Sequence, residues 1–429
     1  MIRFLYNLLW PIGLLFFLPG YLVKMFRRGG YRNKFGQRFA FYDREVRARL
    51  SASPPVWLHA VSVGEVAIAL KLARAITAVR AGARFVLTTT TTTGFASANK
   101  NILPAMEVIY TPLDFWPIMR KAFGAIRPER VVLVEAEVWP NLTAAARARR
   151  IPIALVNARL SGRSEERFRR FRWIVASTFR LLDLVCVQET RDIDRWVALG
   201  VRRERIRHTG SIKYDPADRD SALKTATMRA FHLTPGNAGQ LVLFGASTHR
   251  GEEAILARTF LALRKDFPQL TLFIVPRHVE RIPQIRRQLE SLSLQVKLCS
   301  EAEADGESRP DCILLDKTGE LQRWYGLATV VFVGKSLTVQ GGQNPVEPIV
   351  AGKPVIFGPH MENFAALARE LVANDAAIQV SDPAALEGAM AKLLGAPDAR
   401  VRLVENARRV LDSHSGATAR TAKLILDLK

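Results

Sequence analysis

Residues 57–65, WLHAVSVGE, decide the fold of the chain. An apolar run suited to a buried strand ends at residues 62–64, and helical spacing of apolar residues begins at Glu65. In open α/β sheets the groups that meet a ligand sit at the carboxyl ends of strands, so Glu65 is placed for chemistry. Ser62 and Glu65 also have the spacing of a capping box, in which both side chains only satisfy free amides at a helix start. Taken alone, this stretch favours the capping box.

Strand-like and helix-like segments alternate on both sides of a break at residues 210–216, a pattern typical of βαβ units on parallel sheets. Before the break we expect strands at 56–61, 85–89, 108–110, 131–135, 153–157 and 184–188. After it we expect strands at 241–245, 272–275, 296–298, 313–315, 330–333, 355–357 and 377–380, followed by helices at 399–411 and 417–428. The sequence therefore predicts two doubly wound halves, with the ligand in the cleft between them.

Composition indicates a globular protein, because 48% of the 429 residues are apolar and 24% are charged. The three cysteines form no CxxC motif, which argues against a disulfide framework or a structural zinc site and favours a reducing compartment. The net charge of +22 calls for nucleic acid or an anionic membrane as a partner. Nucleic acid is disfavoured, because the basic residues are not interleaved with aromatic ones as a base-stacking surface requires.

Residues 2–23 are almost wholly apolar and are long enough to cross a bilayer, although Pro11 and Pro19 also allow a kinked or shallow insertion. A basic flank without acidic residues follows, comprising Lys24, Arg27, Arg28, Arg32, Lys34 and Arg38. This order disfavours a cleaved signal peptide. By the positive-inside rule we expect a single N-terminal anchor, with the rest of the protein on the cytoplasmic side. The alternative is a buried first helix of the globular domain.

Two familiar motifs are set aside. Residues 334–336, GKS, resemble the end of a P-loop, but Thr329 stands where that motif needs glycine. Asp192 and Asp194 have the spacing of a metal-binding D-x-D motif. They lie in a helical run, where residues two apart point in different directions, so a solvated helix face is the better interpretation.

The remaining polar groups lie at predicted strand ends. The first half offers carboxylates, at Glu65, Glu135 and Glu137, and the second half offers cations and helix starts. In residues 344–347, NPVE, asparagine suits the N-cap, proline the first helical position and glutamate the third. Such a helix start binds phosphate, and Arg277 would add a second contact. The alternatives are a capped helix without a ligand and a structural arginine.

Eight motifs in this order carry a resemblance that covers essentially the whole chain: WLHAVSVGE, TTTTTTG, VEAEVWPNL, NARLSGRS, GSIKYD, STHRGEE, VPRHVER and GGQNPVEP. Together they resemble the 3-deoxy-D-manno-octulosonic acid (Kdo) transferases of the lipopolysaccharide inner core. The resemblance implies a GT-B glycosyltransferase of two Rossmann-like domains that moves Kdo from CMP-Kdo to a lipid A precursor. It implies an inverting reaction at the cytoplasmic face of the inner membrane, with no metal in the active site and no cofactor.

Matched to the family's motifs, Glu65 is the general base, and Glu135 and Lys213 help to stabilise the transition state. The resemblance implies CMP-binding roles for Pro276, Arg277, Thr318, Gly319, Glu320, Asn344, Pro345, Val346 and Glu347. The expected organisation is an anchor and basic flank at 1–30, an acceptor-side domain at 31–209 and a CMP-Kdo-binding domain at 210–429, whose last helix can pack back on the first domain. Expected partners are CMP-Kdo, the lipid A precursor and the anionic membrane surface.

Two departures from the family pattern affect the donor side, where Lys335 and Gln343 replace a glycine and a histidine. Two other functions stay open. One is a GT-B transferase for another nucleotide sugar, which would bind UDP more tightly than CMP. The other is a basic, membrane-tethered binding protein without catalysis, although strand-end carboxylates would repel the phosphates of its ligand.

Overall fold

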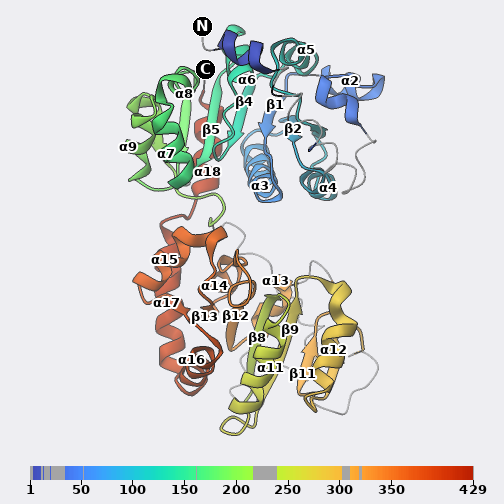
Figure 1. The fold of residues 1–429 in the computed structure, drawn as a ribbon, viewed down its shortest axis with the longest axis vertical. Coiled ribbons are helices and arrows are strands. Elements are labelled where there is room, and N and C mark those ends of the chain that lie inside the picture. Colours follow the sequence, from blue (N-terminus) through green and yellow to red (C-terminus); the bar gives the residue numbers. More distant parts are fainter. Residues whose placement is uncertain are drawn as a thin grey trace. The chain divides into compact units, whose positions relative to one another are not determined.

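A computed structural model describes residues 3–10, 13, 20, 34–51, 53–160, 162–215, 239–301, 310–317 and 321–428. The chain divides into two compact units (Figure 1). Unit 1 comprises Met1–Asp215 and His414–Lys429, and unit 2 comprises Pro216–Ser413. The last helix of the chain therefore belongs with unit 1. The expected CMP-binding residues 318–320 lie outside the described residues.

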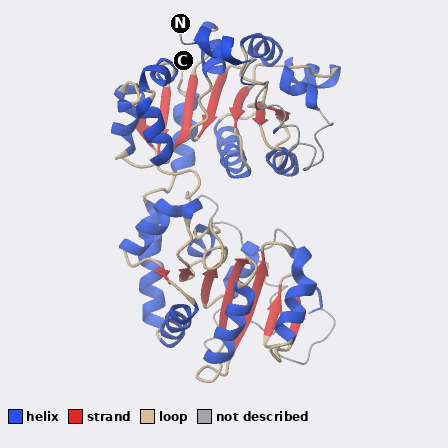
Figure 2. Ribbon diagram, viewed as in Figure 1, coloured by secondary structure: helices blue, strands red, loops and turns tan. Residues whose placement is uncertain are grey.

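Unit 1 is built on a seven-stranded parallel sheet in the order β3-β2-β1-β4-β5-β6-β7. Its strands are β1 (Val56–His59), β2 (Phe85–Thr89), β3 (Met106–Tyr110), β4 (Arg130–Val134), β5 (Ile153–Ala158), β6 (Leu184–Val187) and β7 (Ile206–His208). Its helices are α2 (Arg44–Ser51), α3 (Val63–Val79), α4 (Thr92–Lys100), α5 (Trp116–Ile126), α6 (Pro140–Ala148), α7 (Gly162–Arg170), α8 (Arg172–Phe179), α9 (Asp192–Ala198) and α18 (Ala417–Leu426). Figure 2 shows helices on both faces of this sheet.

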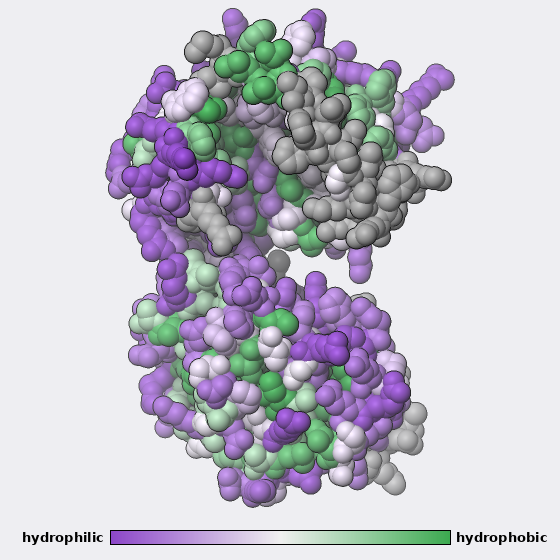
Figure 3. Space-filling model, in the orientation of Figure 1, coloured by the Kyte–Doolittle hydropathy of each residue, from purple (hydrophilic) through white to green (hydrophobic). Residues whose placement is uncertain are grey.

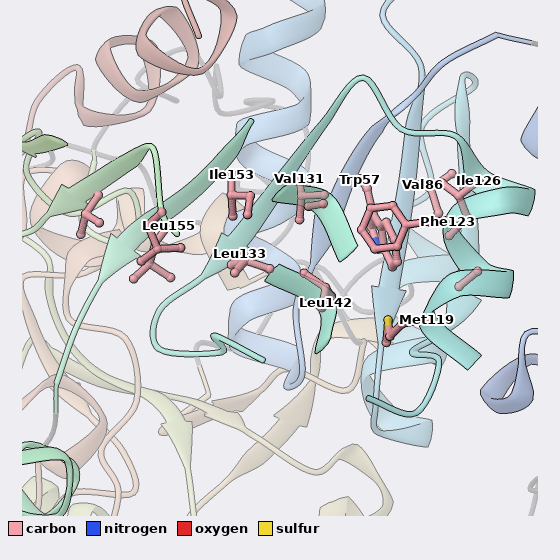
Figure 4. Packing of buried hydrophobic residues seen from close by; sticks show 14 of the residues in the cluster. Trp57, Val86, Met119, Phe123, Ile126, Val131, Leu133, Leu142, Ile153 and Leu155 are labelled. Atoms are coloured by element: carbon pink, nitrogen blue, oxygen red, sulfur yellow. The ribbon is translucent and has the colours of Figure 1, made fainter. Parts of the chain in front are cut away.

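Both faces of the unit 1 sheet are buried, so alternate residues of one strand enter different cores. Trp57 packs with residues of α5, α6 and α8 on one face, where its ring lies 4.9 Å from that of Phe123 (Figure 4). Its neighbours Val56 and Leu58 pack with α3 and α18 on the other face. Burial on both sides explains why the strand is an unbroken apolar run instead of an alternating one.

Unit 2 repeats this architecture, with a seven-stranded parallel sheet in the order β10-β11-β9-β8-β12-β13-β14. Its strands are β8 (Leu241–Thr248), β9 (Leu270–Pro276), β10 (Val296–Leu298), β11 (Cys312–Leu314), β12 (Val330–Val333), β13 (Val355–Phe357) and β14 (Ile378–Gln379). Its helices are α11 (Glu252–Leu263), α12 (Ile282–Glu290), α13 (Leu321–Trp324), α14 (Val346–Val350), α15 (Ala365–Ala373), α16 (Pro383–Gly395) and α17 (Pro397–Asp412).

The fold expected from the sequence, two doubly wound Rossmann-like units, is confirmed. Every strand expected is present, with ends within three residues of those expected, and β7 is an additional edge strand. The expected membrane anchor at residues 2–23 falls largely outside the described residues; positions 3–10 are helical. Within the described part of the chain, no helix combines the length and the apolar character needed to span a bilayer.

Candidate active site

The strand order of unit 1 places Glu65 and Glu135 at a topological switch point. Neighbouring strands β1 and β4 lead into connections that run to opposite sides of the sheet, which opens a crevice at their carboxyl ends. Glu65 lies in the first turn of α3 after β1, and Glu135 follows β4 directly. The backbone of Glu135 has a φ of 62°, a conformation that costs a non-glycine residue energy and that concentrates at functional sites.

The Glu65 side chain forms a variant of the expected capping box, in which it folds back onto the Val61 amide instead of the Ser62 amide. Its Oε1 accepts a hydrogen bond from the Ser62 hydroxyl at 2.7 Å, and its Oε2 accepts one from the Val61 amide at 2.9 Å. The Ser62 Oγ in turn accepts from the Glu65 amide at 3.4 Å. Glu65 is buried, with 8% of the residue exposed. Its two oxygens offer about four acceptor positions, so these contacts orient the group and leave capacity for a further hydroxyl donor.

Three carboxylates of unit 1 influence one another electrostatically. Burial, followed by the nearby charge of Glu65, raises the pKa of Glu137 to about 7. The same two causes raise the pKa of Glu135, and the charges of Lys213 and Arg159 act against them. When several carboxylates are buried close together, repulsion between their charges favours the protonated form of some of them. Unit 1 therefore presents a carboxylate cluster, Glu65, Glu135 and Glu137, of which one member titrates near neutral pH.

Lys213 joins this cluster from the chain segment that follows β7. Burial lowers its pKa to about 8, and the charge of Glu135 opposes that shift. The two preceding residues are fixed by buried Asn157, whose Oδ1 accepts from the Ser211 hydroxyl at 3.3 Å and from the Ile212 amide at 3.0 Å. The structure thus brings the three predicted residues of unit 1, Glu65, Glu135 and Lys213, to one site.

Unit 2 has its own pocket at strand ends, with a volume of about 370 Å³. Predicted CMP-binding residues Pro276, Arg277, Asn344 and Glu347 line it. Arg277 follows β9, and its amide donates to the Thr248 carbonyl at the end of β8. Gln343, which the sequence placed on the donor side, also lines it, and the pocket residues that the sequence did not single out for this role include Ser247, Lys317, Leu321, Gln322 and Tyr325. The remaining predicted donor residues, Pro345 and Val346, are not among those that line the pocket.

The expected helix cap at Asn344 is wrong. Helix α14 begins at Val346, has five residues, and has Pro345 at its N-cap position without a side-chain cap. Asn344 instead accepts from the Val346 amide at 3.0 Å and donates to the Glu347 carboxylate at 3.1 Å. Burial raises the pKa of Glu347, and hydrogen bonds from Asn344 and Gln322 oppose this. The stretch therefore provides a buried hydrogen-bonded carboxylate in place of a helix start for phosphate.

The loop at residues 334–337 surrounds a carboxylate of the protein itself. Fully buried Glu252 accepts from the amide of Lys335 at 2.8 Å and from those of Ser336 and Leu337 at 2.9 and 3.1 Å. A Cβ on Gly334 would lie 2.4 Å from the Ser247 carbonyl oxygen, so only glycine fits there. Free amides of this kind bind phosphate in P-loops. In this loop the Glu252 carboxylate already accepts from the three amides, in the place that a phosphate occupies in a P-loop.

A simple signal could have found Lys317, which the prediction missed. Lys317 comes shortly after β11 as Arg277 comes after β9, so both are strand-end cations of one sheet. Glu137 was named among the strand-end carboxylates without a role, because its shifted pKa depends on burial that the sequence does not display. In the described residues no group of three or more His, Cys, Asp and Glu side chains could hold a metal ion. The absence of a catalytic metal stays a prediction.

Solved structures share this fold. UDP-GlcNAc 2-epimerase from Neisseria meningitidis bound to UDP-GlcNAc matches with a TM-score of 0.59 and 14% identity, covering 87% of this chain and all of that one. The MnaA–UDP structure from S. aureus matches with a TM-score of 0.54 and 14% identity over 87% of this chain and 96% of that one. At this identity the likeness concerns the fold alone. The protein has the two-unit α/β architecture of the GT-B class.

Sequence relatives identify the family within that class. The family model described as 3-deoxy-D-manno-octulosonic-acid transferase (kdotransferase) matches residues 33–216. The 3-deoxy-D-manno-octulosonic acid transferase of Bordetella pertussis is 35% identical over 394 residues, which is 89% of each chain. That of Haemophilus influenzae is 33% identical over 399 residues, 92% of this chain and 91% of that one. The chain belongs to the 3-deoxy-D-manno-octulosonic acid transferase family and is a glycosyltransferase, as the sequence motifs predicted.

Proposed function

We propose that the protein transfers Kdo from CMP-Kdo to a lipid A precursor, with inversion, in the synthesis of the lipopolysaccharide core. Unit 2 binds the donor and unit 1 binds the acceptor hydroxyl. The observation that carries this proposal is the unit 2 pocket, which gathers Arg277, Lys317, Asn344 and Glu347 at strand ends. Two cations suit a donor that carries both a phosphate and a sugar carboxylate, and a buried carboxylate suits hydroxyl groups of a ribose.

In this mechanism Glu65 takes the proton of the acceptor hydroxyl as that oxygen attacks the anomeric carbon of Kdo. The bond to the CMP phosphate breaks, and the electron pair leaves with the phosphate. Arg277 stabilises the departing phosphate charge. Lys213, next to Glu135, balances the carboxylates of unit 1 and stabilises negative charge on the transferred sugar. No metal takes part in these steps.

We also propose that the protein works at the cytoplasmic face of the inner membrane. An apolar N-terminal segment followed by a basic flank supports this location, and so does the net charge of +22. Anionic lipid attracts such segments by about 1 kcal/mol for each Lys or Arg near the surface. A phosphorylated lipid acceptor lies in the same surface.

The deciding experiment incubates purified full-length protein with CMP-Kdo and lipid A precursor and weighs the product by mass spectrometry. We expect the precursor plus one or more Kdo residues, together with free CMP. Competition with UDP and CMP addresses the alternative of another nucleotide sugar, because tighter binding of UDP would contradict the proposed donor. Binding of anionic lipid without any product would favour a non-catalytic membrane protein instead.

A further inference from the structure

Unit 1 contains a cavity that is distinct from the donor pocket and whose lining includes Val138, one residue after the carboxylate cluster along the chain. Its volume is about 550 Å³, and its lining is mainly apolar. The walls come from the N-terminal helix at Tyr6, from Val138 before α6 and Ala144 within it, and from α7 and α8 at Phe168 and Val175. Small-molecule sites have volumes of roughly 300–1,000 Å³, and a cavity of about 150 Å³ already holds a benzene ring. The space therefore suits a flexible hydrocarbon chain.

The cavity adjoins a strongly basic surface. Exposed arginines follow one another along α7 and the start of α8, at Arg167, Arg169, Arg170 and Arg172. Within the described part of the chain, none of these four has a carboxylate within ion-pair distance. Phe171 and Trp173, 43% and 67% exposed, lie among them, so in this segment basic and aromatic residues do alternate, contrary to the expectation from the sequence. Arginine beside exposed aromatic residues is the composition of surfaces that meet anionic lipid headgroups.

The N-terminal helix at residues 3–10 turns its apolar side outward. Asn7 faces the protein, where its Nδ2 donates to Asn141 Oδ1 at 2.9 Å and its Oδ1 accepts from the Trp116 amide at 3.0 Å. Phe4, Leu5, Leu8 and Leu9 are exposed. Figure 3 shows hydrophobic residues gathered at this helix and hydrophilic ones over α7. A helix arranged in this way needs an apolar environment outside the protein.

The cavity and the carboxylates belong to one short stretch of chain. Glu137 ends the carboxylate cluster, and the next residue, Val138, lines the cavity together with Pro140. Three residues span at most about 10 Å, so one amphipathic molecule reaches both places. We propose that this cavity holds an acyl chain of the acceptor, a phosphorylated and acylated sugar whose hydroxyl lies at the carboxylates and whose phosphate meets the arginines. This subsite rests on the proposed function.

The test fills the cavity and compares two acceptors. Ala144→Leu adds bulk to its wall, and Ala148→Leu makes the same change one helical turn further along α6, at an exposed position. We expect Ala144→Leu to lower kcat/KM for the acylated precursor at least tenfold and to leave that for the chemically deacylated sugar phosphate within twofold. Ala148→Leu leaves both unchanged. Equal losses with both acceptors, or none, would overturn the subsite.

A second measurement does not depend on catalysis. A precursor that carries a photoreactive diazirine on an acyl chain is irradiated with wild-type protein, and the labelled peptides are identified by mass spectrometry. We expect label in peptides that span residues 138–144 and 168–181, displaced by unlabelled precursor. Label elsewhere in the chain, or equal labelling of these peptides by a diazirine phosphatidylglycerol that the precursor fails to displace, overturns the proposal. If the peptides are labelled but no Kdo is transferred, the proposed function fails and the lipid site stands.

Discussion

The stretches at Ser62–Glu65 and Asn344–Glu347 share one spacing and have different structures. Ser62 is the N-cap of α3, a helix of 17 residues, and Glu65 completes the box with the Ser62 hydroxyl. Asn344 precedes a helix of five residues and lies one position before its N-cap, where its side chain accepts from the Val346 amide. Its amide group donates to the Glu347 carboxylate, which is buried beside the cation Arg277.

This difference shows how each carboxylate affects the stability of the fold. The Glu65 carboxylate accepts from a backbone amide and a hydroxyl at a helix start, where negative charge stabilises the helix. Burial raises the pKa of Glu347, so its ionised form is a cost to the folded state. Fold stability therefore does not explain why a carboxylate lies at this buried position. In the proposed function, ligand binding explains it.

Glu65→Gln should have the largest effect and tests whether a capping carboxylate can also be a base. Glutamine retains an oxygen that can accept from the Val61 amide, so we expect a folded protein with a melting temperature close to that of wild type. It cannot accept the proton, so kcat for Kdo transfer should fall by about 10²- to 10⁴-fold. Product formation from CMP-Kdo, followed by mass spectrometry, measures this. Retained transfer would leave Glu65 with its capping role alone.

Glu347→Gln should weaken binding of the donor without destabilising the fold. We expect CMP affinity to fall by about 10- to 100-fold, because hydrogen bonds to a charged group contribute roughly 1.5–3 kcal/mol. A carboxyl group with a raised folded pKa loses stability as pH rises from its unfolded value through its folded value. The donor-free variant should therefore melt at the same or a higher temperature than wild type at pH 8 and should match it at pH 4.

Exposed Glu387 on α16 provides the control, since Glu387→Gln removes the same charge from unit 2 away from the pocket. Calorimetric titration with CMP measures the donor affinity, and thermal melts at pH 4 and pH 8 measure the stability. If Glu347→Gln is clearly less stable than wild type in the absence of donor, this carboxylate supports the fold as Glu65 does. The contrast between the two carboxylates would then be wrong.

The sequence predicted the fold well because both sheets are buried on both faces. Apolar runs such as 131–134 then mark strands without ambiguity. β7 was missed for the opposite reason: in Ile206–His208 only Ile206 is buried, because this strand lies at the sheet edge. A polar edge strand carries little hydrophobic signal, although it avoids pairing with other chains.

The site was predicted less completely, because its chemistry depends on tertiary burial. Strand ends identified Glu65, Glu135 and Arg277, and the family resemblance added Lys213; the structure places these four residues in two sites. The cap at Asn344 failed because the NPVE spacing shows neither how short the following helix is nor where the carboxylate points. Similarly, the positive φ values of Glu135 and Ser247 come from the surrounding sheet, since neither residue type favours that conformation.

Glu137→Gln should have a smaller effect and tests the coupling inside the carboxylate cluster. Burial and the charge of Glu65 raise the pKa of Glu137 to about 7, so its ionisation adds a negative charge beside the proposed base near neutral pH. We expect the variant to remove an inflection near pH 7 from the pH profile of kcat/KM and to change its value by about tenfold or less, since one pKa unit corresponds to about 1.4 kcal/mol. An unchanged inflection would assign it to another group.

The same substitution has a signed effect on stability. Because the folded pKa of Glu137 lies above the unfolded value, wild type loses stability as pH rises through about 7. Glutamine has no such titration, so the variant should gain relative to wild type from pH 5 to pH 8. Thermal melts across this range measure the difference, and a variant that loses stability at pH 8 would contradict the direction of the shift.

Ser62→Ala should have the smallest effect. It tests whether the helix cap formed by Ser62 and the base proposed at Glu65 act independently. Removing an N-cap hydroxyl costs about 1 kcal/mol of stability, and Thr91→Ala removes the corresponding cap of α4, whose hydroxyl oxygen accepts from the Gly94 amide at 3.0 Å. We expect similar decreases in melting temperature for both variants. Ser62→Ala leaves the Val61 amide to hold the Glu65 carboxylate, so Kdo transfer should fall only a few-fold. A loss as large as that of Glu65→Gln would mean that the Ser62 hydroxyl itself takes part in the reaction, and the box would then be catalytic as a unit.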